Sequence, residues 1–269
     1  MNSVAIVIPI YKEKLLADEL TSLRQSYWEF RDFPIIGVCP VDMPITYYQD
    51  EFPRIEWKRF APEYFKGISG YNKFMLSEEF YAAFIEEFEY ILICQTDVWI
   101  FNGNELQSWC DKGFDYIGAP WIRRSCYNKF PLKQWMSFDQ WKNHNKGERC
   151  RQDLWGKVGN GGLSLRKVKS HYDITRNKKD LIDYYLTCGK RFYAEDIFWG
   201  MEAEGFRYPT ETEALKFSFD KDPDYCYYKN NFELPFGCHA WNKGRNARFW
   251  LPMLGFAPKS NKMSRYPIN

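Results

Sequence analysis

The sequence predicts an α/β fold with a mostly parallel central sheet flanked by helices. Residues 4–8 form a continuous apolar run that ends at Pro9, as expected of a strand buried on both faces. Leucines at positions 15, 16, 20 and 23 follow at helical spacing and predict an amphipathic helix over residues 13–27. A second apolar run over residues 33–40 completes a β-α-β unit, which favours parallel strands.

Further elements follow along the chain. Aromatic residues and a methionine recur at helical spacing over residues 72–88, and a buried strand is expected over residues 90–94. Short strands are expected at residues 116–119 and 162–165. These elements predict a single domain over residues 1–255, followed by a basic tail over residues 256–269.

Residues 121–155 differ from the rest of the chain. Basic side chains alternate there with tryptophan and tyrosine, and no clear periodicity is visible. We expect a long excursion or lid, since structureless segments of this length are usually functional or mobile. A solvated surface loop is the plainer alternative.

Composition excludes several classes of protein. The 269 residues carry 37 Lys and Arg against 35 Asp and Glu, a net charge of +2 that argues against a dedicated nucleic-acid binder. Aromatic residues make up 19% of the chain, which suits sugar or nucleobase faces but also ordinary packing. The eight cysteines include no Cys-x-x-Cys pair, and we see neither a secretion signal nor a long apolar run. We therefore expect a cytoplasmic protein with reduced thiols and no zinc cluster.

Gln95, Thr96 and Asp97 follow the strand expected over residues 90–94. Ligands of open parallel sheets bind outside the carboxyl ends of the strands, so Asp97 could hold a hard divalent cation against a diphosphate. A turn aspartate that caps the next segment is an equally good explanation. The position of a first acid in an Asp-x-Asp pair is taken by Gln95.

Asn160 lies among Gly159, Gly161 and Gly162, a pattern that permits close approach of the backbone to a ligand. The spacing matches neither a dinucleotide fingerprint nor a P-loop, so a tight turn before a strand remains the alternative.

Glu195 and Asp196 precede an apolar helical start, where one acid could cap the helix and the other could accept a proton from a hydroxyl. His239 is one of only three histidines. It could be structural, or it could complete a metal shell begun by Asp97.

Taken in order, these features resemble the GT-A class of nucleotide-sugar-dependent glycosyltransferases, with a Rossmann-like fold. More closely, the chain resembles a domain-of-unknown-function family of suspected glycosyltransferases. The resemblance rests on the segments IPIYKE (8–13), GYNK (70–73), QTD (95–97), DYIGAPW (115–121), GNGGLSLR (159–166), Glu195-Asp196 and PFGCHAW (235–241).

The resemblance implies roles for individual residues. Asp97 and His239 would hold Mn²⁺ or Mg²⁺, Asp196 would be the general base, and Glu195 would contact substrate hydroxyls. Trp121 and Trp241 would contact the acceptor. The nucleotide-sugar donor, with a UDP-sugar expected, would be bound by Pro9, Tyr11, Glu13, Tyr71, Asn72, Lys73, Gln95, Thr96, Asp97, Asn160, Gly161 and Gly162.

The acceptor implied by the resemblance is a hydroxyl of a glycan or of a lipid-linked sugar, as in polysaccharide biosynthesis, and a peripheral position at the inner face of a membrane stays open. Three alternatives also remain. These are a retaining transferase on the same fold, a nucleotidyltransferase, and a carbohydrate-binding protein without catalysis, for which Gln95 is the best support.

Overall fold

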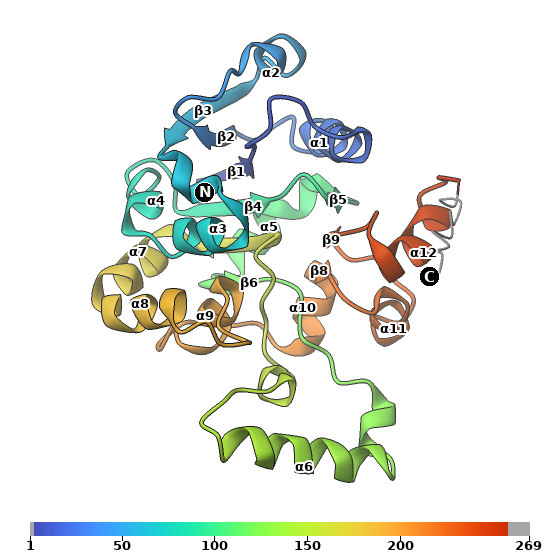
Figure 1. Ribbon diagram of the computed structural model, residues 1–269. Coiled ribbons are helices and arrows are strands. Elements are labelled where there is room, and N and C mark those ends of the chain that lie inside the picture. The colour runs from blue at the N-terminus through green and yellow to red at the C-terminus, as the bar shows by residue number, and fades with distance from the viewer. Residues whose placement is uncertain (1–2, 258–269) are drawn as a thin grey trace, which may run out of the picture.

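The computed structural model describes residues 3–257 and confirms the predicted α/β class. Its central six-stranded sheet has the order β3-β2-β1-β4-β7-β6 (Figure 1). The strands are β1 (Val4–Pro9), β2 (Ile35–Pro40), β3 (Ile55–Phe60), β4 (Tyr90–Cys94), β6 (Tyr116–Ile117) and β7 (Leu163–Lys167). The first four are parallel, whereas β7 runs antiparallel to both β4 and β6.

Helices cover both faces of this sheet, which explains why β1 contains no polar residue. Ile6 and Ile8 point into one core and Ala5 and Val7 into the other. The first core is covered by α1 (Ala17–Glu29), α2 (Thr46–Glu51) and α5 (Leu106–Asp111). The second is covered by α3 (Gly67–Met75), α4 (Glu78–Ala82), α7 (Val168–Asn177), α8 (Lys179–Thr187) and α9 (Glu195–Met201).

A second, three-stranded sheet was not predicted. It has the order β5-β9-β8, with β5 (Val98–Ile100), β9 (Gly237–His239) and β8 (Ser218–Phe219). The small core beside it contains Trp241 and Trp250 and is covered by α10 (Glu211–Phe217), α11 (Pro223–Lys229) and α12 (Gly244–Met253). Strands of two or three residues leave too little alternation to be read from sequence.

Several expected elements begin or end a few residues away from their predicted bounds, and two differences are larger. The helix expected over residues 72–88 is divided between α3 and α4, because Ser77 caps α4 by accepting a hydrogen bond from the Phe80 amide. Phe256, placed in the basic tail, packs against Trp99 and Trp241. Residues 258–269 of that tail lie outside the described residues.

The excursion over residues 121–155 contains a helix that the sequence did not reveal. Helix α6 (Leu132–His144) lies apart from the main body (Figure 1), between 3-10 turns at Ser125–Asn128 and Arg151–Leu154. Two further 3-10 turns lie at Pro62–Phe65 and Gly103–Glu105. Only Met136 of α6 is buried, so the helix lacks the apolar inner stripe by which amphipathic helices are recognised.

All eight cysteines carry free thiols. Among residues 3–257, every helix is too short or too polar to cross a bilayer.

Candidate active site

The small sheet brings three ionisable side chains together. In its register Val98 pairs with His239, and Phe219 pairs with Cys238, so Asp97 and Asp220 both lie beside the histidine. His239 Nε2 is 3.3 Å from Asp97 Oδ1, and its Nδ1 is 3.0 Å from Asp220 Oδ1. The predicted proximity of His239 to Asp97 is therefore confirmed; their role as metal ligands stays a prediction.

Electrostatics at this cluster are dominated by the two carboxylates. Burial alone would lower the pKa of His239, but Asp220 and Asp97 raise it to about 10. Burial opposes ionisation of Asp97, yet His239 and Lys243 hold its pKa well below the usual range. Lys243, just before α12, forms the ion pair with Asp97 Oδ2 and was not predicted.

The cluster fits a divalent cation. His239 Nδ1 is within hydrogen-bonding distance of Asp220, while the buried Nε2 faces Asp97 Oδ1 at 3.3 Å. A histidine that binds a metal commonly donates its other ring N–H to a carboxylate, which fixes the orientation of the ring. Asp97 and His239 would be the ligands, provided that His239 gives up its proton and Lys243 releases Asp97.

The glycine-rich turn lies against this cluster. Asn160 adopts φ 141°, and its Oδ1 accepts a hydrogen bond of 2.9 Å from the Gly162 amide. The Gly162 carbonyl in turn accepts from the Gln95 amide at 2.9 Å. A Cβ on Gly162 would lie 2.7 Å from Cε1 of His239 and closer still to Nε2. Position 162 therefore has no room for a side chain while His239 keeps its place.

Glu195 is buried beneath this turn. Its carboxylate forms an ion pair of 3.2 Å with Arg166, which is itself fully buried and also donates to Tyr81. Burial raises the pKa of Glu195 to about 7, against the attraction of Arg166. A Cβ on Gly161 would collide with this carboxylate. The structure gives no support to the expected contact of Glu195 with substrate hydroxyls, because only 3% of the residue is exposed and its carboxylate is paired with Arg166.

Asp196 points into a separate pocket beside the cluster. This pocket is also lined by Asp220 and by Trp121, one of the two tryptophans expected to contact an acceptor. Burial, reinforced by the nearby charge of Asp220, raises the pKa of Asp196. Asp196 Oδ1 also accepts a hydrogen bond of 2.9 Å from the Ile197 amide in the first turn of α9, where the helix dipole favours a negative charge.

A cavity of about 270 Å³ lies on the other side of Asp97. Six residues expected to bind the donor line it, namely Pro9, Tyr11, Tyr71, Gln95, Thr96 and Asp97. Six others were missed: Glu19, Tyr64, Phe65, Gly67, Ile68 and Lys243. Tyr11 lines the cavity and is 51% exposed, so a planar base could stack on its ring.

Four predicted residues lie elsewhere. Glu13 and Lys73 are exposed and are not among the residues that line this cavity, where Glu19 supplies the carboxylate instead. Asn72 accepts a long hydrogen bond of 3.4 Å from the Glu195 amide and is not among the residues that line the cavity. The expected acceptor contact of Trp241 is wrong, because its ring is buried and donates a 2.7 Å hydrogen bond to Ser22.

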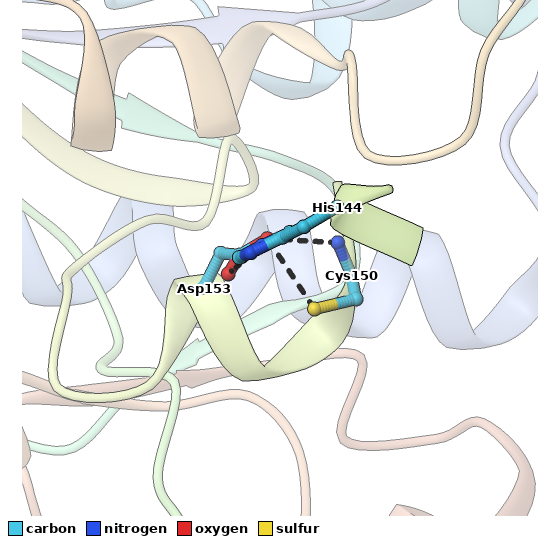
Figure 2. A group of neighbouring side chains, drawn as sticks. All are labelled: His144, Cys150 and Asp153. Atoms are coloured by element: carbon cyan, nitrogen blue, oxygen red, sulfur yellow. Dashed lines mark hydrogen bonds and ion pairs between the residues drawn. The ribbon is translucent and has the colours of Figure 1, made fainter. Parts of the chain in front are cut away.

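A second group with metal-ligand chemistry lies at the base of the excursion. Figure 2 shows His144, Cys150 and Asp153 turned toward one another. His144 Nε2 is 2.9 Å from Asp153 Oδ1, and the Cys150 amide and thiol lie 2.9 and 3.3 Å from Asp153 Oδ2. Gln140 also donates to Asp153, so this carboxylate is satisfied within the protein. Its evident role is to fasten the end of α6 to the Arg151–Leu154 turn.

Solved structures of glycosyltransferases share this fold. Galactosyltransferase LgtC, solved with donor and acceptor sugar analogues, is 15% identical, with a TM-score of 0.53 over 93% of this chain and 95% of that one. Mouse xyloside xylosyltransferase 1 is 11% identical, with a TM-score of 0.53 over 88% and 97% of the two chains. The mannosyltransferase Ktr4p from S. cerevisiae, solved with GDP, is 8% identical, with a TM-score of 0.52 over 79% and 68%.

At these identities the likeness establishes the fold, and the predicted GT-A-type architecture is confirmed. The chain belongs to the family described as "Protein of unknown function (DUF5672)", whose profile matches residues 54–239. No curated protein matches the sequence.

Proposed function

We propose that the protein is a glycosyltransferase that moves a sugar from a nucleoside-diphosphate donor, with a UDP-sugar preferred, to a hydroxyl of a glycan or lipid-linked acceptor. One observation carries the proposal. Asp97, His239 and Asp220 form a continuous cluster between two pockets, one lined by Tyr11 and the other containing Asp196. A donor and an acceptor need two adjoining sites of this kind.

The donor would occupy the first cavity. Its base would stack on Tyr11, and its diphosphate would extend toward Asp97 and Lys243. Asp97 and His239 would hold Mn²⁺ or Mg²⁺, which when bound neutralises the charge that gathers on the departing diphosphate. Lys243 can release Asp97 and pair with a phosphate oxygen, because its side chain is 65% exposed. The backbone of Gly161 and Gly162 would approach the sugar.

The acceptor would enter the second pocket, along the face of Trp121. We assign the general base to Asp196, which takes the proton of the attacking hydroxyl in an inverting transfer. The raised pKa of its carboxyl makes it a stronger base than an exposed aspartate. The reaction would be retaining instead if Asp196 only oriented the acceptor.

A thermal-shift panel of nucleotide sugars with and without Mn²⁺ tests the donor site. A ligand at one hundred times its Kd stabilises the native state by about 2.7 kcal/mol, which shifts Tm by roughly 5–10 °C for a domain of this size. The Mn²⁺-dependent part of the shift should disappear in Asp97→Asn. Glu13→Gln is the matched control, because Glu13 is exposed and does not line the cavity. Absence of any shift across the panel would contradict the proposal.

Asp196→Asn tests the base. Transfer should fall by about 10²–10⁴-fold while the donor-induced shift in Tm is retained. Unchanged turnover would remove Asp196 from this role, and NMR of the product's anomeric linkage would decide between inversion and retention.

A further inference from the structure

Helix α6 carries an unusual concentration of exposed apolar side chains. Fifteen large hydrophobic residues are exposed among residues 3–257, and five of them fall within residues 130–141. They are Phe130, Leu132, Trp135, Phe138 and Trp141, with exposures of 81, 39, 60, 57 and 60%. Isolated exposed hydrophobic residues need no explanation, whereas a cluster of this kind marks an interaction surface.

The three aromatic residues of α6 share the side that faces away from the protein. At 100° per residue, Trp135, Phe138 and Trp141 all lie at least 100° around the helix from Met136, the buried position. The opposite side is held to the Arg151–Leu154 turn through hydrogen bonds of Gln140 to Asp153 and of Gln152 to the Met136 carbonyl. We call Trp135, Phe138 and Trp141 the outer face of α6.

The charge around this face has one sign. Residues 129–146 contain four exposed lysines and a single acidic residue, a formal net charge of +3 with His144 neutral. The lysines are Lys129, Lys133, Lys142 and Lys146. The acidic residue, Asp139, accepts a hydrogen bond from Gln152 on the side facing the protein. Lys133 lines a pocket with Met136 and Gln152 on the side facing the protein, so Lys129, Lys142 and Lys146 supply the positive charge around the outer face.

We propose that the outer face of α6 docks on an anionic lipid bilayer, with its aromatic rings in the interfacial region and Lys129, Lys142 and Lys146 against the lipid headgroups. Tryptophan prefers this interface because its ring is apolar and its N–H is polar. Helices that lie in the interfacial plane combine an aromatic face with lysine or arginine. A second copy of this chain fits the surface poorly, since pairing two outer faces would oppose two clusters of charge +3.

The excursion that carries α6 also borders the second pocket. Arg151, Leu154 and Trp155, at the end of the excursion, form part of its wall together with Trp121 and Ile122 at the start. A bilayer held against α6 would therefore lie at the far end of the segment that borders the pocket containing Asp196. The proposal itself concerns lipid binding and holds whether or not the protein transfers sugars.

Cosedimentation of the full chain with vesicles tests the proposal. The protein should pellet with vesicles of phosphatidylglycerol and phosphatidylcholine, but not with phosphatidylcholine alone. Binding should weaken as NaCl is raised, because salt screens the lysines. The triple variant Trp135→Ser/Phe138→Ser/Trp141→Ser should lose binding. Trp28→Ser is the matched control, since Trp28 is 68% exposed on α1 and should bind as the wild type does.

The lysines are tested separately. Lys142→Gln/Lys146→Gln should lower the partition coefficient roughly 25-fold, since each lysine near an anionic surface contributes about a five-fold factor. Lys216→Gln/Lys229→Gln, at exposed positions of α10 and α11, is the matched control and should leave binding unchanged.

Quenching by brominated phosphatidylglycerol provides a readout that needs no disruptive change. Trp135→Phe and Trp141→Phe keep an aromatic ring at each position, and each should remove part of the quenched fluorescence. The proposal is overturned if the wild type ignores anionic vesicles or if the triple variant binds equally well. It is also overturned if sedimentation velocity shows a dimer that the triple variant dissociates, because the outer face would then be covered by a second copy.

Discussion

Gly162→Ala should disable the candidate metal site without changing any ligand. The new Cβ would lie 2.7 Å from Cε1 of His239 and closer to Cδ2 and Nε2, whereas ordinary contacts begin at 3.4 Å. The imidazole must therefore withdraw from the turn by roughly 1 Å. The turn cannot yield easily, because the Gly162 amide is bonded to Asn160 and its carbonyl to the Gln95 amide.

The expected size of the effect follows from this displacement. A misplacement of about 1 Å typically costs about 10²-fold in a positioned reaction, which corresponds to roughly 2.7 kcal/mol. Loss of orientation at a metal ligand lowers metal affinity by about 10–100-fold. We therefore expect the Kd for Mn²⁺ in the presence of a nucleoside diphosphate to rise by a factor in this range.

Electron paramagnetic resonance of free Mn²⁺ measures this Kd without knowledge of the donor sugar. Gly118→Ala is the matched control, because its Cβ would meet its nearest neighbour, the Gly159 carbonyl, at 3.2 Å and require only a small adjustment. If Gly162→Ala acts through the imidazole, adding it to His239→Ala should cause no further loss. Mn²⁺ affinity equal to that of the wild type in Gly162→Ala would refute the reasoning.

Three further predictions concern stability. Glu195→Gln leaves the buried cation of Arg166 without a counter-ion and should cost about 3–5 kcal/mol in urea denaturation; a loss below about 1 kcal/mol would contradict the buried pair. Burial, reinforced by Arg166, keeps the pKa of His171 well below its ordinary 6.5, so the unfolded chain binds more protons and the free energy of unfolding should fall below about pH 6.5 by up to about 1.4 kcal/mol per pH unit. His171→Gln should remove the contribution of His171 to this pH dependence, and an unchanged profile of unfolding free energy against pH would contradict the prediction. Trp241→Phe removes the hydrogen-bond donor to the buried Ser22 hydroxyl and should lower stability by about 1–3 kcal/mol in thermal unfolding. Substrate affinities should be unchanged. A selective rise in the KM of an acceptor would instead support the predicted contact of Trp241 with the acceptor.

Strands β1, β2 and β4 of the central sheet could be read from sequence because they are buried on both faces, whereas β3 carries polar, partly exposed residues and was not predicted. Residues 4–8 and 90–94 have no polar residue to obscure the pattern, and β1 and β4 are found there. Asp97 could be picked out because a carboxylate directly follows such a strand. The apolar pattern thus identified both the layers and one edge where ligands could bind.

Other residues of the site carry no such signal. Asp220 follows a strand of two residues, and Lys243 precedes a helix with no local feature that points to Asp97. Glu195 and Trp241 illustrate the opposite case. Their residue types suggested contact with a substrate, but the partners that bury them, Arg166 and Ser22, are distant in sequence.

The sequence by itself determined the α/β class, the parallel core and the segments that carry the candidate site residues, because buried segments show a local pattern of apolar residues. Only the tertiary structure decided which of these segments meet. The pairing of β5, β9 and β8 places Asp97, His239 and Asp220 side by side, although 123 positions separate Asp97 from Asp220. Such pairings are set by the packing of the whole chain, so no short stretch of residues specifies them.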